Sequence, residues 1–212
     1  HRFLDLHTEG LLNDDYRFHA LPDACTYVVF DQRDRSFCGV TRLRAFAEEL
    51  NLGREFHFTN IRLLPGVWQG PRAHGQIDSA YRGELPLMAV NQRLEGLDFA
   101  RKQALLVSLV EDMQARGLVA ANPATERIFA AMDDIHSVAD MADTVGLSPR
   151  QLQRVLKQTT GFTPHDFLKV LRLQQSLLGE PSLSYADQSH FIHSFRKATG
   201  YTPGQYARKF DV

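Results

Sequence analysis

The stretch LSPRQLQRVLKQTTGFTPHDF, residues 147–167, has a fainter second copy near the end of the chain, YADQSHFIHSFRKATGYTPGQY, residues 185–206. When Gly161 is aligned with Gly200, apolar residues pair with apolar residues and basic residues pair with basic residues. Duplication of a supersecondary unit is the simplest explanation of such a repeat. The last third of the chain is therefore expected to contain the same structural device twice.

The first copy contains the signals of two helices joined by a tight turn. Ser137–Asp140 has the Ser-x-x-acid form of a helix start, and Gly146 lies where the turn should be. Ser148 can cap a second helix, with Pro149 at its first position and Gln151 able to reach back to the cap. This order of helix, glycine-containing turn and helix is typical of the helix-turn-helix motif.

The second of these helices, expected over 149–159, is amphipathic. Its inward face is expected to consist of Leu152, Val155 and Leu156. Its outward stripe, at spacing i, i+3, i+4 and i+7, consists of Arg150, Gln153, Arg154 and Lys157. Arginine can pair bidentately with guanine and glutamine with adenine in the major groove. A solvated charged face is the alternative interpretation, but the capped motif and its second copy favour a DNA reader.

The second copy predicts another reading helix over 188–198, with Phe191 and Phe195 facing the core. Its outward positions are occupied by Ser189, Ile192, His193 and Arg196. An outward isoleucine can contact a thymine methyl group. His190 and His193 have a spacing that metal ligands use, but no third ligand is evident, so we predict no metal site.

Between the copies, residues 164–178 have the period of a longer helix that would act as a rigid spacer. A separation of about 34 Å, one turn of B-DNA, would let both reading helices enter successive major-groove segments on one side of a duplex. A terminal helix is expected over 204–210.

Charge is distributed unevenly along the chain of 212 residues. The net charge is −1, yet residues 148–212 contain nine basic and four acidic residues. A local basic surface is the electrostatic signature of phosphate binding. The chain contains no GxSxG, P-loop or HExxH motif, and no CxxC motif, so an enzyme is not expected and no cofactor is predicted. No apolar run is long enough to span a membrane.

The first part of the chain is expected to be rich in strands. Segments 26–31, 36–44 and 55–64 are rich in β-branched and aromatic residues and are bounded by turn residues. Helical periods follow over 97–116, which ends before Gly117, and over 125–134. The broad apolar face of the 97–116 helix would pack on its own domain or against a second protomer.

Residues 135–210 resemble the DNA-binding domain of AraC/XylS-type transcriptional regulators. The segments that carry this resemblance are LSPRQLQR, GFTP with the following RL, and YADQSHFIHSFRKATGYTP. The resemblance implies a bacterial cytoplasmic regulator with two helix-turn-helix units joined by a linker helix. Carried over by position, the residues that would read or hold DNA are Pro149, Arg150, Gln151, Gln153, Arg154 and Lys157, followed by Gln188, Ser189, His190, Ile192, His193 and Arg196.

The sequence departs from this family pattern before the second reading helix. Only Gly179–Ser184 lies where the family has a short helix, so about nine residues are missing by comparison with the first copy. We expect them to be absent from the printed chain rather than from the protein, since Phe191 and Phe195 would otherwise lose the helix that buries them. His1 in place of a methionine also suggests a trimmed chain.

The N-terminal part resembles, less specifically, the small β-rich sensory domains of one subgroup of these regulators, through LPDACTYVVFD and IRLLPGVWQG. The expected fold class is thus α+β, with a cupin-like or reduced-barrel domain and a helix over 1–119 and an all-α double helix-turn-helix domain over 124–212. Side chains that could line an effector pocket are Tyr27, His57, Arg62 and Trp68.

The expected partners are double-stranded DNA, a small-molecule effector, a second protomer and, for an activator, RNA polymerase. Two alternatives stay open at this point. The chain could be a non-DNA-binding protein that pairs with a complete regulator and antagonises it. It could also be an enzyme with a pocket formed by Cys38, His57 and His74, although these residues follow no spacing rule.

Overall fold

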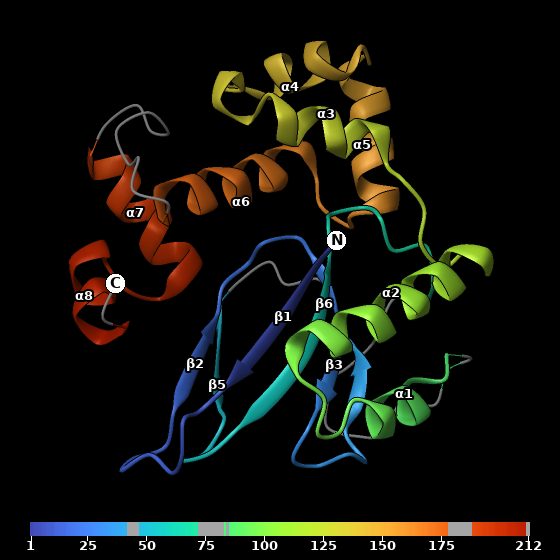
Figure 1. Ribbon diagram of the computed structural model, residues 1–212. Coiled ribbons are helices and arrows are strands. Elements are labelled where there is room, and N and C mark those ends of the chain that lie inside the picture. The colour runs from blue at the N-terminus through green and yellow to red at the C-terminus, as the bar shows by residue number, and fades with distance from the viewer. Residues whose placement is uncertain (42–46, 72–82, 84, 178–187, 211–212) are drawn as a thin grey trace. The chain divides into compact units, whose positions relative to one another are not determined.

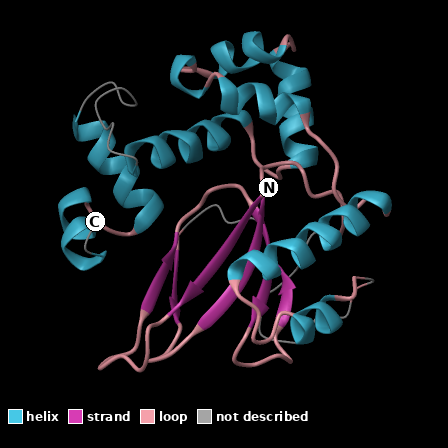
Figure 2. Cartoon of the chain, viewed as in Figure 1, coloured by secondary structure: helices cyan, strands magenta, loops and turns pink. Residues whose placement is uncertain are grey.

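The computed structural model describes residues 1–41, 47–71, 83, 85–177 and 188–210, and the chain divides into two compact units (Figure 1). Unit 1 comprises His1–Phe18, Cys25–Arg42 and Leu50–Ala121. Unit 2 comprises Asn122–Val212 together with two earlier segments, His19–Ala24 and Leu43–Glu49. Strands precede helices along the chain. Figure 2 shows both kinds of element, and the expected α+β class is confirmed.

Four strands form the main sheet of unit 1, in the order β1 (Arg2–His7), β6 (His57–Leu63), β3 (Thr26–Asp31) and β4 (Cys38–Val40). Every neighbouring pair is antiparallel. The strands expected over 26–31 and 55–64 are confirmed. The one expected over 36–44 is shorter within the described residues, since positions 36 and 37 lie in the turn before β4 and 42–44 lie outside the described residues.

A second sheet pairs two short strands that the sequence did not predict, β2 (Arg17–Ala20) and β5 (Glu48–Asn51). Both strands are only four residues long, and β5, with the sequence Glu-Glu-Leu-Asn, does not alternate between polar and apolar residues. Strands this short carry little periodic signal, because a period of two needs several repeats to be recognised.

One face of the main sheet is buried because the strands alternate. The side chains at Val28, Phe30, Ile61 and Leu63 have no exposed surface. Two helices, α1 (Leu87–Arg93) and α2 (Phe99–Ala115), complete this core with apolar side chains such as Leu87, Leu106 and Met113. Asp98 caps the start of α2 by accepting a hydrogen bond from the Arg101 N–H, and the helix ends before Gly117, which has φ of +69°.

From residue 123 onward, unit 2 consists of helices. Their bounds are α3 (Pro123–Ala130), the 3-10 helix η1 (Met132–Asp134), α4 (Val138–Val145), α5 (Pro149–Thr159), α6 (Pro164–Leu177), α7 (Gln188–Thr199) and α8 (Pro203–Phe210). The region expected as one helix over 125–134 is therefore two pieces. The departure from the family pattern at Gly179–Ser184 falls within 178–187, which lies outside the described residues.

Unit 2 has two apolar clusters. One surrounds α3 to α6 and contains Ile128, Met141, Leu152, Leu156 and Phe167, each fully or nearly fully buried. The other joins α6, α7 and α8 through Leu173, Phe195 and Tyr206. Among the described helices, none combines the length and the apolar character that a membrane crossing requires.

Candidate nucleic-acid interface

The helix pair α4–α5 is built by the caps that the sequence predicted. The Ser137 side chain accepts from the Asp140 N–H, and α4 ends at Gly146, whose φ of +67° favours glycine. Ser148 and Gln151 form a reciprocal capping box at the start of α5, with Pro149 in the first turn. Two helices joined by a tight glycine turn are the helix-turn-helix arrangement.

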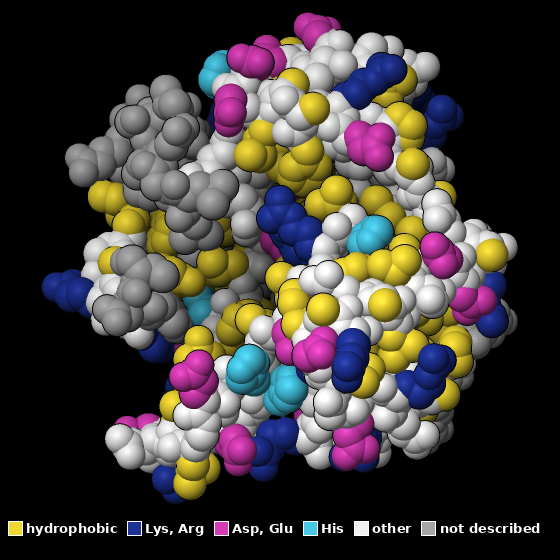
Figure 3. Space-filling view, in the orientation of Figure 1, with side chains coloured by type: hydrophobic (Ala, Val, Ile, Leu, Met, Phe, Trp, Pro, Cys, Tyr) yellow, Lys and Arg dark blue, Asp and Glu magenta, His cyan; other side chains and the backbone are white. Residues whose placement is uncertain are grey.

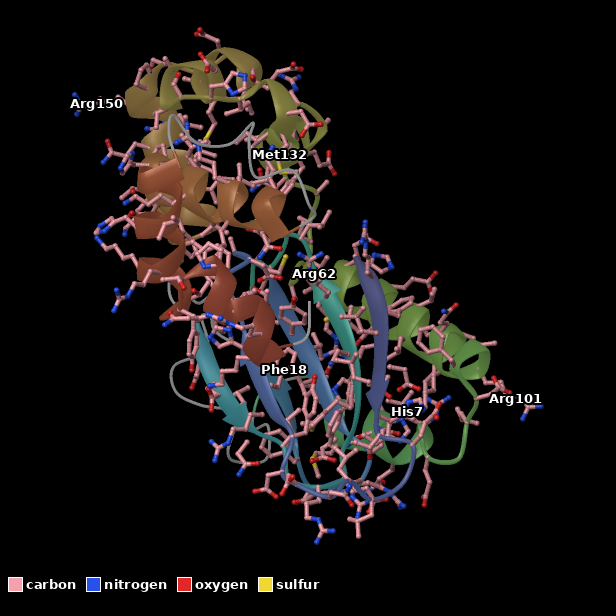
Figure 4. The ribbon with its side chains drawn as sticks, turned by 90° about the vertical axis from the view of Figure 1, so that its left-hand side faces the viewer. His7, Phe18, Arg62, Arg101, Met132 and Arg150 are labelled. Carbon is pink, nitrogen blue, oxygen red and sulfur yellow. The ribbon has the colours of Figure 1, made fainter. Side chains whose placement is uncertain are left out.

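The second helix of this pair has two sharply different faces. Leu152 and Leu156 have no exposed surface, and Val155 is half-buried. The exposed side chains include all four of the expected outward stripe, Arg150, Gln153, Arg154 and Lys157. Figure 4 shows Arg150 pointing away from the helices of unit 2. The predicted division into an inward and an outward face is confirmed.

The capping box limits the hydrogen bonds that the Gln151 side chain can make with a DNA base. Its side-chain oxygen accepts from the Ser148 N–H at 2.9 Å and lies 2.9 Å from the Ser148 hydroxyl. A bidentate contact to adenine needs both the oxygen and the amide nitrogen of glutamine. Gln151 is therefore occupied at the helix start, and Gln153, which is exposed, has both groups available on the stripe.

Acidic residues lie on the neighbouring elements rather than on α5. Asp133, Asp134 and Asp143 are exposed on η1 and α4. On the face drawn in Figure 3, acidic side chains appear over these helices at the top of the view. Since α5 carries three basic residues and no acid, it is the helix of this pair whose charge suits a phosphate backbone.

The second expected reading helix is present as α7, Gln188–Thr199, close to the predicted 188–198. Ile192 is 38% exposed, His193 and Arg196 are exposed, and Phe195 is buried as expected. Gln188, Ser189 and His190 belong to the first turn of α7, but their side chains and that of Phe191 lie outside the described residues.

The four residues expected to line an effector pocket are not brought together. Tyr27 and Arg62 are partners in the β3–β6 register, so their side chains share one face of the sheet. His57 is five residues from Arg62 on the same strand and therefore points to the opposite face. Trp68 follows β6, packs against the core of unit 1, and donates from its indole N–H to the Pro71 carbonyl at 3.1 Å.

The cysteine proposed for an enzymatic pocket is also separate from His57. Cys38 is fully buried in the core of unit 1, with its sulfur 3.3 Å from the sulfur of Met88. A thiol buried among apolar groups is a packing residue rather than a nucleophile. His74 lies outside the described residues.

A polar cluster that the sequence did not predict lies beneath the sheet of unit 1. Lys102 on α2 is 2% exposed, and its ammonium lies 2.9 and 3.1 Å from the two carboxylate oxygens of Asp5. It also lies 2.9 Å from His57 Nε2 and 3.1 Å from the Thr59 hydroxyl. The cluster therefore gives a buried ammonium the acceptors that burial of a charge requires.

The same cluster includes three groups with the geometry of metal ligands. The ligand atoms of Asp5, His7 and His57 lie within 4.8 Å of one another. The Lys102 ammonium, however, is in hydrogen-bond contact with both Asp5 and His57 and already neutralises the carboxylate. A divalent cation there would be placed against a positive charge, so we interpret the cluster as a buried ion pair.

The stability of unit 1 is expected to fall on acidification through Asp5. Burial raises the pKa of Asp5, but hydrogen bonds from Thr59 and Lys102 and the charge of Lys102 outweigh it, so the pKa lies below the usual 3.8. A carboxyl group whose pKa is lowered by folding stabilises the protein above the unfolded pKa and loses that contribution as the pH falls through the folded value. Urea unfolding between pH 6 and about pH 3 should therefore show a declining free energy of unfolding.

The matched variant for this experiment is Asp5→Asn. It removes the titrating group and should flatten the decline by the share that Asp5 contributes. A decline of equal steepness in both proteins would show that other carboxyl groups are responsible.

Together these features define α4 and α5 as a helix-turn-helix motif. Residues 135–169 match the family described as bacterial regulatory helix-turn-helix proteins, AraC family. The helix-turn-helix segment of this chain, which includes α4, α5 and the first turns of α6, is therefore of the AraC type.

Two curated proteins are similar to parts of the chain. The HTH-type transcriptional activator RhaS of Escherichia fergusonii is 30% identical over 132 residues, which cover 53% of this chain and 48% of that protein. The uncharacterized HTH-type transcriptional regulator YidL of Escherichia coli K12 is 30% identical over 95 residues, covering 40% of this chain and 32% of that protein. The chain thus spans half or less of the length of either relative.

A solved structure, ToxT from Vibrio cholerae, resembles the whole chain with a TM-score of 0.51. The similarity covers 97% of both chains at 10% sequence identity. At this identity the likeness concerns the fold, and it agrees with a β-containing N-terminal part followed by a helical C-terminal part.

Proposed function

We propose that the chain is a transcriptional regulator of the AraC type that binds DNA sequence-specifically. The observation that supports this most directly is the face of α5, where four exposed basic and amide side chains lie over two fully buried leucines. A helix with such a face fits the major groove, where arginine and glutamine can read base edges and lysine can bind phosphate.

The finer proposal is that α5 and α7 both read DNA, in successive segments of the major groove. The exposure of Ile192, His193 and Arg196 on α7 supports it. The helix α6 lies between the two in the chain and supplies buried residues to both apolar clusters of unit 2, as a rigid spacer would (Figure 1). The DNA contacts assigned to Pro149, Gln188, Ser189 and His190 belong to this proposal. That of Gln151 is restricted to its side-chain N–H groups, because its oxygen is used in the capping box.

For unit 1 we propose a role in sensing a signal or in pairing two protomers. Tyr27 and Arg62, which share a sheet face, are the part of the expected effector site that this proposal retains. RNA polymerase would be a partner if the protein activates transcription. The regulator itself would act in the bacterial cytoplasm, where the DNA is.

The proposal is tested by fluorescence anisotropy on a duplex of about 40 base pairs, long enough for successive half-sites, selected in vitro from a random pool by the chain itself. Affinity should fall steeply with salt, because bound lysine and arginine release counterions from the phosphates. Lys157→Ala should reduce the slope of log affinity against log salt by about one unit. Arg154→Ala should cost about 1–3 kcal/mol and relax the base preference at one position.

The matched control is Lys169→Ala, because Lys169 is an exposed lysine on α6 that pairs with Asp166 at 3.3 Å. It should leave the salt slope unchanged. If no duplex is enriched from the pool, or if binding does not respond to salt, the chain is not a DNA reader. The alternative of a partner that antagonises a complete regulator would then be favoured.

A further inference from the structure

The segment His19–Ala24 belongs to the compact unit that contains α5 and α7, although more than a hundred residues separate it from both helices. We call it the bridging segment. The Pro22 carbonyl accepts a hydrogen bond of 3.0 Å from the side-chain amide of Gln174 on α6. One part of the bridging segment is therefore fixed to the helix that joins the two proposed readers.

The two ends of the bridging segment pack into different cores. Ala24 is 1% exposed and lies in the cluster that surrounds α3 to α6. Leu21 packs against the cluster formed by Leu173, Phe195 and Tyr206, which holds α7 against α6 and α8. Ala24 also has φ of +55°, a conformation that a non-glycine residue keeps only where its surroundings determine it.

His19 extends the contact to the turn and helix after α7. Its ring lies edge-on to the ring of Tyr201, with centroids 5.7 Å apart, and 5.3 Å from the ring of Tyr206. Burial lowers the pKa of His19, which favours the neutral ring that packs against these aromatic side chains. The bridging segment thus packs against the second apolar cluster through His19 and Leu21.

A second segment from the N-terminal part of the chain, residues 47–49, contacts the end of α7 and the helix α8. The Ala47 N–H donates to the Ala198 carbonyl at 3.0 Å. Carbonyl groups in the last turn of a helix have no partner within the helix, so this bond supplies one from outside. Two residues further on, Glu49 accepts from the Lys209 ammonium of α8 at 2.7 Å, and that ammonium lies 4.6 Å from the centre of the Tyr201 ring.

We propose that the bridging segment and residues 47–49 are positioning elements for the second reading helix. They hold α7 against α6 and α8, and they connect its core to the core that carries α5. The placement of α7 relative to α5 then depends on residues contributed by the N-terminal part of the chain, none of which needs to touch DNA. This inference rests on the proposed function, because it gives these residues a role in how α7 meets the groove.

The test is Leu21→Ala, studied by hydrogen exchange and by hydroxyl-radical footprinting on the duplex selected by the wild-type chain. Because Leu21 is half-buried, amide exchange in α7 and α8 should rise by about tenfold, whereas exchange in α5 should not change. The footprint should lose the half-site read by α7 and keep the half-site read by α5. Leu21→Met, which conserves volume, should restore both readouts.

Leu11→Ala is the matched control, since Leu11 is 65% exposed and belongs to unit 1. Unchanged exchange in α7 in the Leu21→Ala protein would overturn the proposal, and so would faster exchange in α5 to the same degree. If Leu21→Ala fails to fold, Glu49→Gln takes its place, because it weakens the contact between Glu49 and Lys209 of α8. Amide exchange in α7 and α8 is then compared with that in α5 in the same way. A wild-type chain that binds no duplex would count against the proposed function alone, because hydrogen exchange still decides the positioning role.

Discussion

Replacing Lys102 by methionine is expected to lower the free energy of unfolding by about 3 kcal/mol, a large share of the stability of a small domain. The Lys102 side chain is 2% exposed and that of Asp5 is 15% exposed. Methionine fills a similar volume but leaves the Asp5 carboxylate without its counter-charge in a place that water hardly reaches. Breaking a buried ion pair from one side costs about 3–5 kcal/mol, and the hydrogen bond from Thr59 keeps the expected loss near the lower figure.

Urea unfolding followed by tryptophan fluorescence measures this loss, since Trp68 is the only tryptophan and packs against the core of unit 1. Arg101→Met is the control on the same helix. Its side chain is 74% exposed and pairs with Asp98, so a change within about 0.5 kcal/mol is expected. The double variant Asp5→Asn with Lys102→Met should recover part of the stability, because both charges are gone. Equal losses in Lys102→Met and Arg101→Met would contradict the interpretation of the cluster as a buried ion pair.

The sequence does indicate that Lys102 is unusual, because a lysine there lies among apolar positions, whereas lysine is seldom fully buried. The positions 102, 106, 109 and 113 lie on one side of a helix, and the last three are among the apolar residues, with Leu105 and Val110, on which the prediction of the 97–116 helix rested. A lysine at such a position has two interpretations. Either the buried face of the helix was assigned wrongly, or the lysine is buried and paired with an opposite charge. The partners come from β1, about a hundred residues away, and from β6, about fifty residues away, so only the tertiary structure decides between these two interpretations.

Local chemistry explains why the bounds of α5, α6, α7 and α8 were predictable to within a residue or two. Ser137, Gly146 and Ser148 act through backbone groups three or four residues away, and the structure uses each of them as the sequence indicated. The inward face of α5 follows from its helical period alone. By contrast, the sharing of one sheet face by Tyr27 and Arg62 depends on strand register, which is set by pairing across the sheet. Alternation along β6 places His57 and Arg62 on opposite faces, but the register decides which of them shares a face with Tyr27.

The bridging segment lies beyond sequence reasoning for a similar reason. Its six residues have no period, and their contacts are with side chains about 150 to 180 residues later, such as Gln174 and Tyr201. The sequence did indicate that Phe195 is a core residue, since the expectation about the residues before α7 rested on its burial. Phe195 is 3% exposed in a cluster against which Leu21 packs.

Phe167→Ala is expected to destabilise unit 2 by about 3–5 kcal/mol. Phe167 lies on α6, has no exposed surface, and packs edge-on against Phe129, with ring centroids 6.2 Å apart. Truncation removes the burial of the ring and leaves a cavity between α3 and α6 that the surrounding helices can fill only in part. The helical signal in far-ultraviolet circular dichroism should therefore disappear at a lower urea concentration than in the wild-type protein.

The consequence for DNA binding separates a loss of folding from a loss of contact. Phe167 is buried in the apolar cluster around α3 to α6, so its side chain cannot contact DNA. Phe167→Ala should therefore reduce the fraction of folded protein and leave the salt slope of the folded fraction unchanged. Lys157→Ala should do the opposite, with a smaller slope and an unchanged unfolding midpoint. Phe99→Ala is the control for ring truncation, since Phe99 is 39% exposed at the start of α2 and should cost far less. A Phe167 variant that unfolds at the wild-type urea concentration would mean that α6 is not packed against α3, and the rigid spacer between the two reading helices would then lose its physical basis.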